Sequence, residues 1–342
     1  MNFILSLIIT LVIVHLLVVI PLVGILAANL QFLFGVILPY AAVLIFLIGM
    51  IWRVTTWAKS PVPFRIPTTA GQQKSLPWIK DSKLDNPTTT AGVVGRMLLE
   101  ILLFRSLFRN TKMEYREGPR VTYEWEKWLW LFAIVFHYAF LVILLRHLRF
   151  FTEPVPVFVQ ILEALDGFAQ VGIAPLTGLG LPVMLLSGVV LPAAVTFLLL
   201  RRLLIPGVRY ISLPADYFPL FLILGIATTG ILMRYILKLD VVAVKQLMMG
   251  LVTFKPVVPQ GIGVLFYIHL FMVCTLFAYF PFSKLVHLGG IFLSPTRNLA
   301  NNNRMVRHVN PWWYPVKVHT YEHYEDEFRE KMIEAGIPVE KE

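Results

Sequence analysis

The chain has 342 residues, of which 57% are hydrophobic and only 15% are charged, and its formal net charge is +10. Soluble domains carry far more charge, so the composition excludes a soluble protein. The basic residues flank apolar runs, which is typical of residues that set membrane topology, so we predict no nucleic-acid partner. The single cysteine, Cys274, excludes an internal disulfide, an iron–sulfur cluster held by this chain alone and a covalent haem site.

Six apolar runs are long enough to span a membrane as helices. We predict spans at Phe3–Ala27, Phe32–Trp52, Leu129–Phe150, Leu181–Leu200, Tyr217–Leu237 and Gly263–Leu285. The sequence therefore predicts an all-α integral membrane protein, built as a bundle of six transmembrane helices. Six spans bring most Lys and Arg to one side, and the positive-inside rule places that side, with both termini, in the cytoplasm. We expect a multi-pass protein of the cytoplasmic (inner) membrane.

These spans divide the chain into four regions. Residues 1–52 hold two N-terminal spans, 53–128 form a cytoplasmic loop, 129–288 form a four-helix core, and 289–342 form a cytoplasmic tail that we expect to dock a partner. Within the loop, Gly92–Arg109 places polar residues near helical spacing between apolar ones. This pattern predicts a basic amphipathic helix, either on the inner membrane surface or packed on a partner subunit.

Three further segments have helical patterns but do not span the membrane. On the outer side, Val155–Val171 and Val241–Phe254 are apolar and too short to cross, so we expect them to be lids over the outer ends of the spans. In the tail, Tyr321–Ala335 predicts a charged helix, which Gly336 and Pro338 would stop.

Four histidines lie in two of the apolar runs. The third predicted span carries His137 and His147, and the run of the sixth carries His269 and His287. Histidine is costly inside a membrane and marks function there. The two helices run antiparallel, so His137 is expected to meet His287, and His147 to meet His269. Each pair supplies two axial imidazoles for one haem iron, which predicts two stacked, non-covalent b haems in a haem-binding helix bundle.

The spacing of the histidines differs between the two helices. His137 and His147 are about 15 Å apart along a helix axis, whereas His269 and His287 would be about 27 Å and five turns apart, on one face of a continuous helix. A bend at Pro281 would remove part of this difference. The sequence does not show how the two spacings are reconciled.

Basic residues close to the histidines are candidate partners for haem propionates. Arg146 and Arg149 flank His147, and Lys284 precedes His287 by three residues. The alternative for each is an ordinary boundary charge that extends to the interface. For the histidines themselves the alternative is hydrogen bonding between helices in a haem-free membrane anchor. A transporter is disfavoured because few acidic residues lie at membrane depth.

The spacings of ten and then eighteen residues, on the third and sixth spans, resemble the haem-binding gamma subunit of respiratory nitrate reductase. The resemblance covers roughly Phe32 to His287. It implies that His137 and His287 hold the inner haem, and that His147 and His269 hold the outer haem.

Two further stretches, Asn303–Met332 and Asp240–Pro259, resemble the DsrM family, the haem-b membrane subunits of the sulfite-reduction-associated transmembrane complex. This resemblance implies exchange of electrons with menaquinone near the outer haem. It also implies a cytoplasmic iron–sulfur partner of the heterodisulfide-reductase type, and further membrane and outer-side redox subunits. The terminal chemistry would lie in a partner chain, which makes this chain an oxidoreductase subunit in dissimilatory sulfur metabolism. A gamma-type cytochrome b subunit of a nitrate reductase or heterodisulfide reductase stays the alternative.

A quinone site requires hydrogen-bond partners for two carbonyls and an apolar slot for the ring. The resemblance places it near the outer haem. The candidates on the outer connections are Lys245, Lys255, Asp166 and Gln170.

Overall fold

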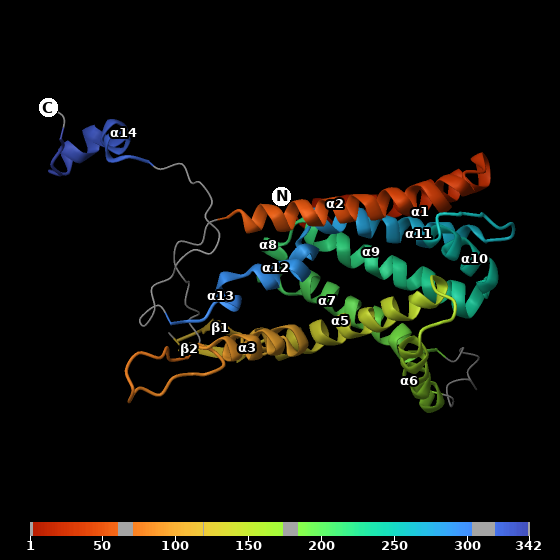
Figure 1. Cartoon of the computed structure of the whole chain (residues 1–342), viewed down its shortest axis with the longest axis horizontal. Coiled ribbons are helices and arrows are strands. Elements are labelled where there is room, and N and C mark those ends of the chain that lie inside the picture. The colour runs from red at the N-terminus through yellow and green to blue at the C-terminus, as the bar shows by residue number, and fades with distance from the viewer. Residues whose placement is uncertain (1–2, 61–70, 119, 174–183, 303–318, 341–342) are drawn as a thin grey trace. The chain divides into compact units, whose positions relative to one another are not determined.

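A computed structural model describes residues 3–60, 71–118, 120–173, 184–302 and 319–340 (Figure 1). This part of the chain is mostly helical, and six of its helices are long and apolar enough to cross a membrane. They cover Phe3–Ala28, Leu33–Ala58, Lys127–Phe150, Leu186–Leu204, Pro214–Leu237 and Val264–Phe282. The predicted helical membrane class and all six predicted spans are confirmed, with shifts of a few residues at their ends.

Four of the spans contain a turn of another helix type. The main helices are α1 (Phe3–Ala28), α2 (Leu38–Ala58), α5 (Lys127–His147), α7 (Leu186–Leu204), α9 (Pro214–Ile231) and α11 (Val264–Tyr279). The π turns are η1 (Leu33–Ile37) and η4 (Leu232–Leu237), and the 3-10 turns are η2 (Leu148–Phe150), η5 (Phe280–Phe282) and η6 (Lys284–Val286). The shorter helices are α3 (Thr90–Leu103), α4 (Arg105–Phe108), α6 (Val157–Ile173), α8 (Pro206–Ile211), α10 (Val241–Val252), α12 (His287–Leu293), α13 (Pro295–Asn298) and α14 (Tyr321–Glu334).

The interior of the bundle joins five of the spanning helices. α5 packs on α7, α7 packs on α9, and α1 and α9 both pack on α11; Figure 1 shows α5 and α7 side by side. Their shared apolar cluster contains Leu17, Ala139, Leu191, Val195, Phe218, Leu222, Ile223, Ile268, Met272 and Leu276. The outward faces stay apolar as well, as expected where lipid replaces water.

The segment predicted as an outer lid at Val241–Phe254 contains α10. Its first turn is fixed by Asp240, whose Oδ1 accepts hydrogen bonds from the backbone N–H groups of Val242 at 2.9 Å and Ala243 at 3.1 Å. This N-cap satisfies two donors that the helix itself leaves unpaired. Leu247 and Met248 on α10 are buried in a second apolar cluster with residues of α1, η1 and α11. The other predicted lid, Val155–Val171, overlaps most of α6, which ends two residues later at Ile173.

The sixth span ends sooner than predicted. Its end lies at Phe282 instead of Leu285, and the continuous five-turn helix from His269 to His287 is wrong. Pro281 has no N–H for the helical hydrogen-bond ladder, and at Ser283 the backbone is extended, with φ −120° and ψ 177°. Oγ of Ser283 then accepts a hydrogen bond from the N–H of Leu285 at 3.1 Å, which caps the new turn η6. His287 is therefore the first residue of a separate helix, α12, and the 27 Å separation along one axis does not apply.

The predicted amphipathic helix Gly92–Arg109 is present as α3 and α4, separated at Phe104, whose φ is +49°. The C-terminal end of α3 is anchored on α5 of the same chain. Nε1 of Trp130 donates to the carbonyl of Leu103 at 2.7 Å, and the Tyr138 hydroxyl donates to the carbonyl of Leu102 at 2.8 Å. These bonds satisfy carbonyls that a helix end leaves unpaired.

An antiparallel hairpin follows α4, and the sequence analysis did not predict it. β1 (Thr111–Arg116) pairs with β2 (Arg120–Trp125), in a register that runs from Thr111 opposite Trp125 to Arg116 opposite Arg120. Gly118 in the connection has φ +79°, a conformation that glycine adopts without strain. The β-branched and aromatic residues of β2 are typical of strands.

By its contacts the chain divides into two compact units, Met1–Arg53 with Val94–Phe292, and Val54–Val93 with Leu293–Glu342. In the second unit, Nδ2 of Asn301 donates to Oδ1 of Asn86 at 2.6 Å, which joins its two chain segments. The predicted charged helix at Tyr321–Ala335 is confirmed as α14. Of the tail stretch Asn303–Met332, residues 303–318 lie outside the described residues.

Candidate functional site

The first pair of histidines, His137 and His287, is formed by α5 and the start of α12. The centroids of the two imidazoles are 6.0 Å apart and the ring planes are 80° to each other. The rings of Phe136 and Phe104 stand edge-on to His137, with centroid distances of 4.8 Å and 5.0 Å. The predicted meeting of these two histidines is therefore present, although His287 reaches it from a separate helix.

The second pair, His147 and His269, is formed by the last residue of α5 and the middle of α11. The pairing of these two imidazoles stays a prediction. His269 borders Gly230 of α9, because a Cβ atom built there would lie 3.5 Å from Cε1 of the imidazole. At this distance a methyl group at Gly230 would be in ordinary contact with the ring.

Three of the four imidazoles are oriented by backbone carbonyls. Nδ1 of His137 is 2.7 Å from the carbonyl oxygen of Ala133, and Nδ1 of His147 is 2.7 Å from that of Ile143. Nδ1 of His287 is 2.8 Å from the carbonyl oxygen of Lys284. A carbonyl only accepts, so each Nδ1 carries the hydrogen and Nε2 keeps the lone pair that can bind a metal. Metal-binding histidines commonly have this arrangement.

The fourth imidazole is oriented by a side chain. Nδ1 of His269 is 2.9 Å from Oγ1 of Thr229 on α9. The same hydroxyl is 2.8 Å from the carbonyl oxygen of Gly225, one turn earlier in the helix. Thr229 is buried, with 8% of its surface exposed.

The separation of the first pair fits two ligands of one metal ion. Nitrogen atoms about 2 Å from a common metal place their imidazole centroids about 6 Å apart, and the observed distance is 6.0 Å. Within the described residues, no group of three or more His, Cys, Asp or Glu side chains could hold a metal ion. Two imidazoles at this separation suit a metal whose other ligands come from a macrocycle, as in a bis-histidine haem.

A buried polar network adjoins the second pair. Nη1 of Arg146 donates to Oδ2 of Asp166 at 2.6 Å and to Oγ of Ser187 at 3.1 Å. Ser187 donates twice to the same carboxylate, from its N–H at 2.7 Å and its hydroxyl at 2.6 Å. All three residues are buried, and they join α5 to α6 and α7. Nε of Arg146 has no hydrogen-bond partner among the described residues, so one buried donor stays available to a bound group.

The other two predicted propionate partners have protein partners of their own. Arg149 forms an ion pair with Glu163, which lies 3.9 Å from Nη2 of Arg234. Nζ of Lys284 donates to Oδ1 of Asp216 at 2.6 Å. The carboxylate of Asp216 also accepts from a backbone N–H at the start of α9, so it connects that helix end to the turn before His287.

The predicted quinone candidates do not form one cluster. Lys245 on α10 forms an ion pair with Glu153, the side chain of Lys255 is exposed, and Asp166 is saturated by the network beside His147. Gln170 is within α6, but its side chain lies outside the described residues.

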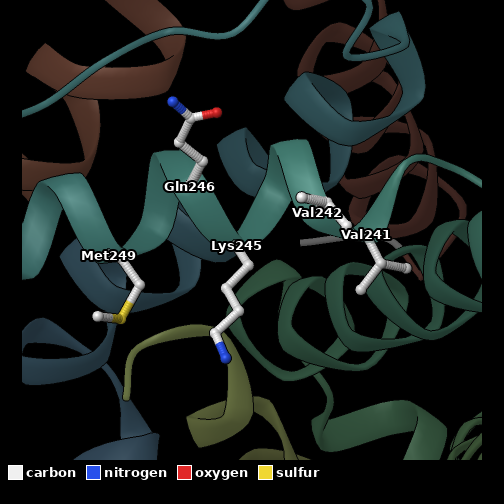
Figure 2. A pocket seen from close by; sticks show the side chains of 5 residues that line it. All are labelled: Val241, Val242, Lys245, Gln246 and Met249. Carbon is white, nitrogen blue, oxygen red and sulfur yellow. The ribbon is translucent and has the colours of Figure 1, made fainter. Parts of the chain in front are cut away.

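A shallow groove of about 390 Å³ runs along α10. It is lined by Val241, Val242, Lys245, Gln246 and Met249. Figure 2 shows Lys245 and Met249 pointing to one side of α10 and Gln246 to the other. The groove brings Lys245 next to apolar side chains, which is one element of a quinone site, and it holds none of the other candidates.

The sequence analysis missed Thr229, Ser187 and Asp216. Each is a polar residue at or inside an apolar span, and that is a usable signal because such residues require partners. Their partners depend on which helix face they occupy, and the sequence alone does not give those faces.

Comparison with known proteins finds one matching family and two similar proteins that share one description. Residues 96–309 match the nitrate reductase gamma subunit family. The chain is 48% identical over 287 residues to a protein of Archaeoglobus fulgidus described as an Hdr-like menaquinol oxidoreductase cytochrome b-like subunit, which covers 82% of this chain and 83% of that protein. A protein of the same description from Archaeoglobus profundus is 46% identical over 281 residues, covering 80% and 81% of the two chains.

Proposed function

The chain belongs to the nitrate reductase gamma subunit family, and from this premise we propose that it is the cytochrome b-like, electron-transfer subunit of a menaquinol oxidoreductase. The names of its two archaeal relatives support this function. The observation that carries it is the 6.0 Å separation of the imidazoles of His137 and His287, together with a hydrogen bond at Nδ1 of each of the four histidines.

We propose that His137 and His287 hold one b haem and that His147 and His269 hold a second. When bound, these groups would supply reversible one-electron transfer at two depths of the membrane. The protein's own contribution is to orient the four imidazoles through their Nδ1 hydrogen bonds. At His137 it adds the rings of Phe104 and Phe136, an apolar surrounding of the kind that tunes a metal site.

The propionate and quinone roles are proposals of the same kind. Arg146 is the strongest propionate partner because its Nε is a buried donor without a partner in the described part of the chain. Arg149 and Lys284 would have to share their existing carboxylate partners. For the quinone, Lys245 is supported by the apolar groove along α10, whereas Lys255, Asp166 and Gln170 are supported by their position in sequence alone.

The wider assignment follows the resemblance to the DsrM family. We propose that both termini are cytoplasmic, as the distribution of Lys and Arg supports. The tail would then dock an iron–sulfur subunit of the heterodisulfide-reductase type, with further membrane and outer-side redox subunits in the same complex. The terminal reaction of dissimilatory sulfur metabolism would take place in a partner chain.

Reduction by a menaquinol analogue tests this function. We expect the purified chain to gain the absorbance of reduced b haem after addition of a short-chain menaquinol, without any partner subunit. His137→Leu should keep quinol-reducible absorbance, because the second pair lies on the proposed quinone side. His147→Leu should keep absorbance that dithionite reduces and lose most of the part that quinol reduces. Chain that contains haem but does not respond to quinol in any form would contradict the proposal.

A further inference from the structure

One of the four imidazoles depends on a side chain for its orientation. His137, His147 and His287 all use backbone carbonyls, which no substitution removes. His269 uses the hydroxyl of Thr229, on a different helix. The hydroxyl of Thr229 therefore contributes to the tautomer of His269, together with the nearby backbone carbonyl of Ile226.

The hydrogen bonds of Thr229 indicate the direction of this bond. The hydroxyl has one hydrogen, and its oxygen lies 2.8 Å from the carbonyl oxygen of Gly225 and 3.0 Å from that of Ile226. Both of these atoms only accept. If Thr229 donates to one of them, its lone pair accepts the N–H of His269 Nδ1, and Nε2 is left unprotonated. The opposite arrangement would place a hydrogen on Nε2 and prevent metal binding.

We propose that Thr229 is the positioning residue that selects Nε2 of His269 as the metal-binding nitrogen. This inference rests on the proposed function and concerns the second pair alone. Thr229 is buried, so water does not readily replace its hydroxyl, and its loss would leave the Nδ1–H of His269 with the backbone carbonyl of Ile226 as its remaining acceptor.

The bond also has an electronic consequence. A hydrogen bond donated by Nδ1–H raises the basicity of the imidazole as a ligand. A more basic ligand stabilises the oxidised metal, so loss of the bond should raise the midpoint potential of the metal group at the second pair. The first pair, whose bonds go to backbone carbonyls, should keep its potential.

The neighbouring residue provides a matched control. Thr228 is exposed, and its hydroxyl donates to the carbonyl of Leu224 at 2.8 Å, one turn earlier, as that of Thr229 does to Gly225. Thr228→Val and Thr229→Val therefore remove the same kind of bond within α9, and only the second removes a histidine contact. Thr229→Ser keeps the hydroxyl.

The test is a redox titration of the purified chain, with haem content measured in parallel. For Thr229→Val we expect the midpoint potential of the haem at the second pair to rise and that haem to bind about 10-fold more weakly. The potential of the haem at the first pair should not change. Thr228→Val should behave as wild type, and Thr229→Ser should restore the original potential. Unchanged potentials and haem content in Thr229→Val, or equal losses in both valine variants, would overturn the inference. Wild-type protein without haem would overturn the proposed function and this inference together, whereas the other outcomes leave the proposed function intact.

Discussion

The two histidine pairs take one residue each from α5 but differ in how the partner histidine is delivered. His269 lies inside the regular helix α11, between residues that belong to the apolar core. His287 lies after an interruption, at the start of α12. The second pair is therefore held by packed helices, whereas the first pair depends on a short turn and on what anchors it. Histidines with the same proposed role thus rely on different parts of the fold.

The charged groups near the two pairs also differ, in how deeply they are buried. Beside the second pair, Arg146, Asp166 and Ser187 form a buried network that joins three helices. Near the first pair, Asp216 is buried but its partner Lys284 is 73% exposed at the side chain. Burial decides how much such pairs matter, since a buried charge that loses its partner is costly and an exposed one is not.

The largest expected effect separates the two pairs directly. His137→Leu should remove the haem of the first pair and leave the second, and His147→Leu should do the reverse. Each variant should retain about half of the wild-type absorbance change between reduced and oxidised protein. Loss of the entire signal in either variant would mean that the pairs are not independent, and full retention in both would remove the histidines from the site.

The next effect concerns the buried network. Asp166→Ala should leave Arg146 buried without its carboxylate and cost about 3–5 kcal/mol of folding stability. The control is Glu153→Ala, which breaks the more exposed pair with Lys245 and should cost at most about 1 kcal/mol. Thermal unfolding in detergent compares the two variants. Equal unfolding temperatures for the two variants would show that the network beside the second pair does not stabilise the fold.

A smaller effect tests the interruption that delivers His287. Gly49 of α2 lies against Pro281, and a Cβ atom at this position would be 2.7 Å from Cβ of the proline. Gly49→Ala should therefore displace the end of α11, cost about 1–3 kcal/mol and weaken haem retention at the first pair only. In the control, Gly207→Ala, nothing lies within 4 Å of the added atom. Haem loss confined to the second pair would contradict this account.

The smallest effect concerns the anchor of the turn before His287. Asp216→Asn removes the charge that holds Lys284 but keeps an oxygen to cap α9, so we expect a cost of about 1 kcal/mol. Lys284→Met should give a similar cost, since Arg202 stays 3.9 Å from the buried carboxylate of Asp216. Haem dissociation from the first pair, followed by transfer to an apoprotein acceptor, measures the consequence. A much larger cost for Lys284→Met would contradict this account, whereas a larger cost for Asp216→Asn alone would be assigned to its ion pair with Arg202.

The sequence predicted the six spans because long apolar runs have few alternatives in a membrane. It also predicted that His137 lies beside His287, since antiparallel helices determine that order. It did not predict the break at Ser283, because the apolar pattern continues through it and only the local backbone shows the turn.

The sequence could not predict the role of Thr229, for a different reason. Thr228 and Thr229 are identical neighbours in an apolar span, and the orientation of α9 alone decides which of them meets His269. The β1–β2 hairpin was missed because short strands carry weak signals next to long apolar helices.

The most direct test of the central claim is a pyridine haemochrome assay on the purified chain, expressed as haem per polypeptide. Two imidazole pairs predict a b-type spectrum and a ratio near two. A ratio near one would limit the claim to a single pair. Well-folded protein without haem would contradict it and would leave the four histidines as hydrogen-bonding residues of a membrane anchor.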